Sequence, residues 1–171
     1  MSAVPSFKLR TLKATDKNSI TRYINNIKIW NQVRDYLPNP YTDKDAEKFI
    51  DFSRKSKPTY NWGITVEDEV IGIIGLTAKT DIYRLNGELG FWLAEPWWGK
   101  GIVTSAITKV TEIGFKEHKL HRIYAEVFED NPASSKVLIK NRFRQEAILK
   151  EAVIKNNRLL DLYIYARLRN E

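Results

Sequence analysis

The 171-residue sequence contains no cysteine, which excludes disulfides, thiolate–metal sites and covalent catalysis through a thiol. It also lacks any apolar run near the ~20 residues that a membrane-spanning helix needs. Its first residues, Met1–Pro5, lack the apolar stretch of a signal peptide. No repeat, low-complexity segment or long linker divides the chain. We therefore expect one domain over residues 1–171 that works in the cytoplasm and does not contact a membrane.

The chain has 28 basic and 21 acidic residues and a net charge of +7. Such a charge favours polyanionic partners such as nucleic acid, ribosomes or a phosphorylated cofactor. The basic residues are spread along the chain, which is typical of a solvated surface, so we expect no direct binding of nucleic acid. The two histidines, His118 and His121, have no acidic or cysteine companions, and no metal site is expected.

The spacing of apolar residues predicts alternating helices and strands. Period-two segments cover residues 7–12, 60–66, 70–80, 84–94, 121–128, 143–154 and 158–168, which indicates strands. Helical spacing follows Asp16, Thr42, Gly101 and Asn131. The first two helices are expected to carry, respectively, Ile20, Tyr23, Ile24 and Ile27, and Ala46, Phe49, Ile50 and Phe52. The order β-α-α-β-β-β-α-β-α-β-β predicts an α/β or α+β domain with a mixed sheet.

The stretch Trp97–Thr104 joins a predicted strand to a predicted helix through a glycine-punctuated turn. The first amides of a helix have no partner within the helix, and the helix dipole adds positive charge there. Gly99 and Gly101 allow a bulky phosphate to approach the main chain. The turn therefore predicts an anion site for a phosphorylated cofactor.

Two motifs in this order resemble the GNAT superfamily of acyl-CoA-dependent N-acetyltransferases. The first is Trp98-Gly99-Lys100-Gly101-Ile102-Val103, where Trp98 replaces a usual polar residue and Val103 a small one. The second runs from Asn131 to Leu138 and is followed by Phe143, with Arg142 in place of a usual glycine. The segments 37–46 and 87–93 are similar to the RimJ/RimL-type branch. This resemblance implies a GNAT fold, a single domain whose central mixed, mostly antiparallel twisted sheet is flanked by helices.

The resemblance also implies a set of residues that bind acetyl-CoA. The main chain of Phe91, Trp92 and Leu93 would meet the pantetheine arm, in the manner of an added strand. Asn131 would bind the pantetheine amide or, equally, cap its helix. Lys136, with Lys140, would meet the 3′-phosphate or simply be solvated. The pyrophosphate would lie on Gly99, Lys100, Gly101, Ile102, Val103 and Thr104.

Two residues are candidates for the chemistry. Glu88 matches a family position for a general base, and an acid with a pKa raised by burial could relay the amine proton through water. The alternatives are a solvent-facing strand glutamate or a structural partner for an arginine. Ser134 resembles the serine that protonates the departing thiolate, and the alternative is a polar residue in a first helical turn. A further family glutamate aligns with Val153, and Glu151 could replace it only if the strand register allows.

The implied activity is transfer of an acetyl group from acetyl-CoA to a primary amine, by direct attack in a ternary complex because no cysteine can carry the acyl group. Members of the RimJ/RimL-type branch acetylate protein N-terminal amines, notably on ribosomal proteins, and we expect such an acceptor. The alternatives are a small-molecule acceptor (a polyamine, amino acid or antibiotic) or a non-catalytic acyl-CoA-binding module. A homodimer is compatible with these expectations.

Overall fold

The computed structural model describes residues 4–170. Its seven strands form a mixed sheet in the order β1-β2-β3-β4-β5-β7-β6. The strands are β1 (Lys8–Arg10), β2 (Asn61–Val66), β3 (Glu69–Ala78), β4 (Asn86–Leu93), β5 (Arg122–Phe128), β6 (Arg144–Lys155) and β7 (Arg158–Leu168). The helices are α1 (Lys17–Ile24), α2 (Ile27–Trp30), α3 (Asp43–Lys55), α4 (Ile102–Lys116) and α5 (Pro132–Lys140), with 3-10 turns at Ala14–Asp16, Asp81–Tyr83 and Glu95–Trp97.

The predicted order of elements is confirmed except between β1 and β2, where the structure has three helices and two were predicted. Two residues of the predicted helical faces also differ. Ile27 does not extend α1, because the Asn26 side chain accepts a hydrogen bond from the Lys28 amide and starts a separate helix there. Ile27 is consequently exposed. Phe52 is exposed too, because the buried face of α3 follows Ala46, Ile50 and Ser53 at helical spacing.

The chain folds as two compact units. The first contains the chain up to Gly75 together with Phe91–Ala106, and the second contains Leu76–Gly90 together with the chain from Ile107 onward. Strands β3 and β4 and helix α4 each begin in one unit and end in the other. The expectation of one domain over residues 1–171 stays a prediction.

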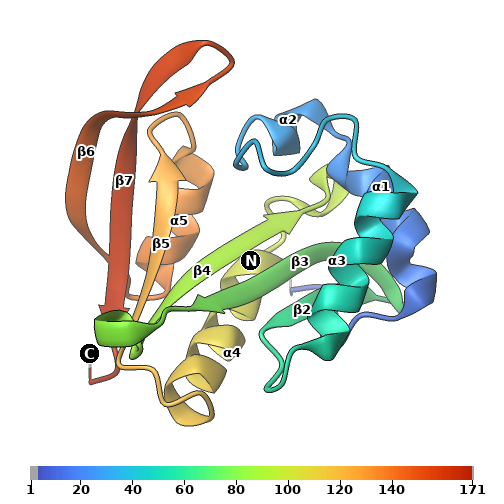
Figure 1. Cartoon of the computed structure of the whole chain (residues 1–171), viewed down its shortest axis with the longest axis horizontal. Helices are drawn as coiled ribbons and strands as arrows, with labels where there is room; N and C mark the ends of the chain where they lie inside the picture. Colours follow the sequence, from blue (N-terminus) through green and yellow to red (C-terminus); the bar gives the residue numbers. More distant parts are fainter. Residues whose placement is uncertain (1–3, 171) are drawn as a thin grey trace. The chain divides into compact units, whose positions relative to one another are not determined.

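In the first unit, α1 and α3 lie side by side (Figure 1). The Thr42 hydroxyl and the Asp45 carboxylate cap the start of α3 reciprocally, as a capping box does. Asn25 hydrogen-bonds both the amide and the carbonyl of Tyr41, each at 2.8 Å, and so ties the end of α1 to the chain before α3. The helices and strands of this unit share a core of Leu12, Ile20, Ile24, Ile29, Tyr41, Ala46, Ile50, Val70 and Ile73.

In the second unit, β4 pairs with β5 in parallel over three residue pairs, from Asn86 with Arg122 to Glu88 with Tyr124. Strand β5 runs on to Phe128 and pairs along its whole length with β7 in the antiparallel sense. The hairpin of β6 and β7 turns at Asn156 and Asn157, whose φ angles of 50° and 59° are those of the predicted tight turn. The predicted inner face of β5 is buried, at Ile123, Ala125 and Val127.

Between residues 4 and 170, no helix has the length and apolar character that crossing a membrane requires.

Candidate functional site

The glycine turn has the local geometry expected of an anion site. Gly99 and Gly101 adopt φ angles of 73° and 79°, the left-handed region that favours glycine. Helix α4 begins directly after them, and the Ser105 amide already donates to the Gly101 carbonyl at 3.1 Å. The amides before Ser105 therefore belong to the first turn of the helix, where no intrahelical carbonyl is available to them.

The side chain of Trp98 turns back from this segment toward the end of β4. Its indole N–H donates to the Leu93 carbonyl at 2.7 Å, although 43% of the residue is exposed. Lys100 holds its ammonium 4.8 Å from the centre of the Trp97 ring. Ile102 is buried, so it could meet a ligand only through its main chain. Thr104 and Val103 are half-buried on the first turn of α4.

The main chain predicted to meet pantetheine already makes contacts within the first unit. The Leu93 carbonyl accepts the Trp98 indole, and a Cβ added to Gly72 would lie 2.4 Å from the Trp92 carbonyl oxygen. The Ala94 amide donates to Ile71 on β3 at 2.8 Å. Phe91 and Trp92 are half-buried, and Trp92 packs against the core of this unit. The role of residues 91–93 in binding pantetheine stays a prediction.

Helix α5 carries the second set of predicted residues. Asn131 caps it, because its side-chain oxygen accepts the Ser134 amide at 3.0 Å. Of the two roles predicted for Asn131, the structure shows that its side-chain oxygen caps the helix. Ser134 lies half-buried in the first turn, and Lys136 is exposed.

The exit of α5 explains how arginine stands where the family has glycine. Arg142 adopts a φ of 65°, and the Phe143 amide reaches back to the Leu138 carbonyl at 3.1 Å. The backbone thus keeps the left-handed ending without glycine. The preceding Asn141, only 4% exposed, accepts from the Thr108 hydroxyl and donates to the Val137 carbonyl, which fixes α5 to α4.

Glu88 lies in a cluster of side chains from three strand segments of the second unit. Its side chain is 15% exposed, and its Oε2 receives the Lys79 ammonium at 2.7 Å and the Tyr124 hydroxyl at 3.3 Å. Lys79 follows β3 directly, where its amide donates to the Asn86 carbonyl. The ion pair that the structure shows for Glu88 is with a lysine, so the alternative of a structural partner is met here by Lys79. That ammonium favours the ionised carboxylate and opposes the effect of burial.

The contacts within the cluster shift the pKa values of Lys79 and Tyr124. Burial alone would lower the pKa of Lys79, but hydrogen bonds to Glu88 and Tyr124 outweigh it, and the pKa of Lys79 is raised. The pKa of Tyr124 is raised as well, by burial first and by the Glu88 charge, whereas its hydrogen bond with Lys79 acts in the opposite direction. At neutral pH the cluster thus contains an ammonium and a neutral phenol.

A second ion pair lies on the same face of the sheet. Arg122, two residues before Tyr124, pairs with Glu146 of β6 and donates to the Asn86 side chain at 3.3 Å. Its guanidinium also lies 4.9 Å from the centre of the Tyr124 ring. Lys79 approaches that ring too, at 5.5 Å. Tyr124 is therefore flanked by two cations.

The terminal hairpin does not place Glu151 as an ordinary strand residue. Leu149 pairs with Leu162 and Val153 with Leu160, so three residues of β6 bulge out opposite Asp161. Glu151 takes a φ of 48° in this bulge, and its amide donates to the Asp161 carboxylate. The strict alternation that would align Glu151 with Val153 is broken there.

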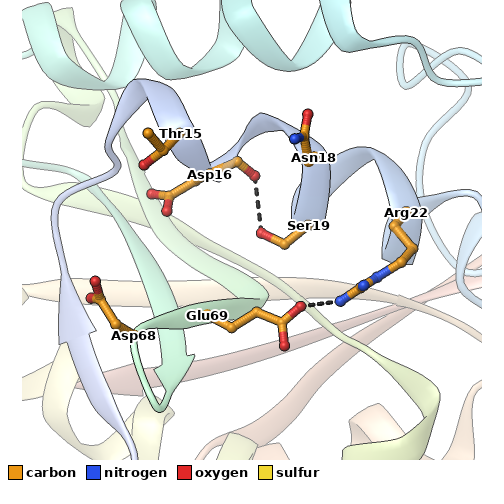
Figure 2. A pocket seen from close by; sticks show the side chains of 7 residues that line it. All are labelled: Thr15, Asp16, Asn18, Ser19, Arg22, Asp68 and Glu69. Atoms are coloured by element: carbon orange, nitrogen blue, oxygen red, sulfur yellow. Dashed lines mark hydrogen bonds and ion pairs between the residues drawn. The ribbon is translucent and has the colours of Figure 1, made fainter.

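None of the predicted site residues lines the pocket in Figure 2. It has a volume of about 380 Å³ and is lined by Thr15, Asp16, Asn18, Ser19, Arg22, Asp68 and Glu69. Its charged side chains are matched internally, since Arg22 pairs with Glu69 and Asp16 accepts two hydrogen bonds from Arg10. We assign it no role in the chemistry.

Sequence reasoning missed Lys79, Tyr124 and Arg122. A partial signal was present, because the buried face of β5 at Ile123, Ala125 and Val127 places Arg122, Tyr124 and Glu126 on the opposite face. The sequence offered no comparable signal for Lys79, which meets Glu88 through the register of β3 and β4.

Comparison with known proteins bears on this geometry. Residues 7–144 match the model of the acetyltransferase (GNAT) domain. The chain belongs to the GNAT acetyltransferase family. A curated relative, the ribosomal-protein-serine acetyltransferase of Escherichia coli, is 32% identical over 102 residues, which make up 60% of this chain and 56% of that protein. Across three curated bacterial relatives, the chain spans 64%, 93% and 56% of their length.

Solved structures confirm the GNAT fold. A RimL ribosomal L7/L12 α-N-protein acetyltransferase in complex with coenzyme A has a TM-score of 0.84 at 21% identity, with 98% of both chains covered. The spermidine N-acetyltransferase of Vibrio cholerae, in complex with CoA and spermine, has a TM-score of 0.81 at 23% identity, with 96% of both covered. At these identities the likeness concerns the fold alone.

Proposed function

We propose that this GNAT-family protein transfers the acetyl group of acetyl-CoA to the α-amine of a protein N-terminus. The observation that carries the cofactor assignment is the left-handed Gly99–Gly101 turn at the start of α4, within the matched domain. The cytoplasmic location and the residues that hold the cofactor are part of the same proposal. The 32%-identical ribosomal-protein-serine acetyltransferase supports the choice of acceptor.

The reaction would proceed by direct attack. The neutral amine nitrogen attacks the thioester carbonyl carbon, the carbon–sulfur bond breaks, and the thiolate takes the Ser134 hydroxyl proton. The proton lost by the amine passes through water to the Glu88 carboxylate. Solvent then returns a proton to the Ser134 oxygen and takes the proton from Glu88. An α-amine with a pKa near 8 costs only about 1.4 kcal/mol to deprotonate at pH 7, whereas a lysine near 10.4 costs about 4.6 kcal/mol. A modest base therefore suffices for an N-terminal acceptor.

Charge matching near Glu88 favours a single ammonium over a polyamine. In the second unit, Glu88 is paired with Lys79 and Glu146 with Arg122. A polycation needs an excess of carboxylates, and the chain's net charge of +7 would also repel it at long range. A polyamine acceptor stays the second candidate, because the spermidine acetyltransferase shares the fold.

Release of the CoA thiol tests the proposal. Purified protein is incubated with acetyl-CoA and, in separate series, with N-terminal peptides, polyamines and aminoglycosides. We expect turnover with N-terminal peptides. Faster turnover with spermine would favour the second candidate. Binding of acetyl-CoA without thiol release for any amine would indicate a non-catalytic module.

Substitution of the two candidate catalytic residues tests the mechanism. We expect Glu88→Gln to lower kcat by about 10²-fold or more at pH 7 and Ser134→Ala to lower it by at least tenfold, in line with general acid–base catalysis. The Glu88→Gln defect should shrink above pH 8, where the α-amine is neutral without help. Turnover within twofold of wild type in both variants would refute these assignments.

A further inference from the structure

As the proposed base, Glu88 must be ionised, although its side chain is only 15% exposed. Burial disfavours the charged form of a carboxyl group, and a protonated acid cannot take a proton. The structure counters this tendency at one atom, because the Lys79 ammonium lies 2.7 Å from Oε2. Lys79 is itself 31% exposed, so solvent screens the pair only in part.

We propose that Lys79 is a positioning residue of the reaction, which holds the Glu88 carboxylate ionised and fixes its Oε2 beside Tyr124. This inference rests on the proposed function, in which Glu88 takes the amine proton. Lys79 touches neither substrate nor cofactor in this assignment and acts through Glu88.

Lys79 forms an ion pair with the Glu88 carboxylate. From β5, Tyr124 contributes a hydroxyl at 3.3 Å from Oε2, and Glu126 adds negative charge near Tyr124. Arg122 lies 4.9 Å from the centre of the Tyr124 ring and pairs with Glu146 of β6.

The backbone holds Lys79 in register for this contact. Its amide donates to the Asn86 carbonyl at 3.0 Å, which extends the pairing of β3 and β4 by one residue beyond Ala78. Asn86 lies two residues before Glu88, and alternate residues of a strand share a face. The ammonium and the carboxylate therefore meet because of strand register and do not depend on a mobile loop.

The pH profile of kcat/KM tests the proposal with an N-terminal peptide as acceptor. For wild type, log kcat/KM should rise with a slope of one toward the α-amine pKa near 8. Lys79→Met removes the cation that favours the ionised form of Glu88, so the region of slope two, where both the amine and Glu88 must lose a proton, should extend to higher pH than in wild type. Lys79→Arg keeps a cation and should restore the wild-type profile.

A matched control removes an equivalent lysine elsewhere in the same unit. Lys116 pairs with Glu112 one turn away on α4, and both side chains are exposed. Lys116→Met should leave the profile of kcat/KM unchanged. A Lys79→Met profile that coincides with wild type would overturn the proposal.

Tyr124 provides a readout that needs no activity. The ring carbon bonded to its hydroxyl can be titrated by ¹³C NMR and assigned with Tyr124→Phe. Because the hydrogen bond with Lys79 lowers the pKa of Tyr124, Lys79→Met should raise that pKa further, whereas Glu88→Gln should lower it. Lys79→Arg serves as the folded counterpart if Lys79→Met is unstable.

The two readouts separate the failure of this inference from that of the proposed function. If the Tyr124 pKa shifts as expected but no variant and no wild type releases thiol, the proposed function fails and the positioning role fails with it. If wild type is active but Lys79→Met changes neither the Tyr124 titration nor the pH profile, only the role of Lys79 fails.

Discussion

The glycine turn and the Glu88 cluster differ in the groups that they present to a ligand. The turn at Trp97–Thr104 presents main-chain amides, and its side chains either pack back, as Trp98 does on Leu93, or are buried, as Ile102 is. The cluster presents side chains instead, and Glu88, Lys79 and Tyr124 come from three strand segments. A main-chain site depends on backbone conformation, whereas a side-chain site depends on charge and register. The two should therefore respond to different substitutions.

The largest effect on the turn is expected from Gly101→Val. A side chain at a φ of 79° is strained by about 1–3 kcal/mol, and its Cβ would lie 3.0 Å from the Val4 side chain. We expect the Kd for CoA, measured by isothermal titration calorimetry, to rise at least tenfold. Gly90→Ala is the control, because no atom lies within 4 Å of a Cβ there. Equal affinities in Gly101→Val and wild type would show that the turn does not bind the cofactor.

Arg142→Gly tests the same backbone conformation where the chain does without glycine. A non-glycine residue in the left-handed region costs about 1–2 kcal/mol, and Arg142 is in that region. The free energy of unfolding of Arg142→Gly should therefore be about 1 kcal/mol higher than that of wild type. The substitution would also relieve Arg167, whose pKa is lowered by burial and, secondarily, by the charge of Arg142. Urea unfolding measures the gain. The control is Lys140→Gly, inside the last turn of α5, which should lower the free energy of unfolding by about 1 kcal/mol. Lower stability in both variants would contradict the account of the helix exit.

An effect on the turn smaller than that of Gly101→Val is expected from Trp98→Phe, which removes the indole N–H from the Leu93 carbonyl. The loss of one hydrogen bond at a partly exposed site should cost about 0.5–1.5 kcal/mol of unfolding free energy. The Kd for CoA should rise less than in Gly101→Val, because the amides of the turn are unchanged. Trp98→Arg keeps a donor and should recover part of the stability. A larger loss of CoA affinity than in Gly101→Val would show that the side chain, and not the main chain, governs this region.

The same contrast explains what could be predicted from the sequence. The turn was predictable because glycines mark a backbone conformation, and the change of period around them marks a strand followed by a helix. Asn131 was predictable as a cap because capping is a local interaction, here between residues three positions apart. Lys79 and Tyr124 were not, because strand pairing joins residues 9 and 36 positions from Glu88. The bulge at Glu151 could not be predicted either, because it depends on the Asp161 carboxylate across the hairpin.

The most direct test of the central claim is a two-substrate kinetic analysis of thiol release, with acetyl-CoA and an N-terminal peptide varied together. Direct attack in a ternary complex predicts double-reciprocal lines that intersect, in keeping with a chain that has no cysteine to carry the acetyl group. Parallel lines would reveal a covalent acetyl-enzyme and would contradict the account.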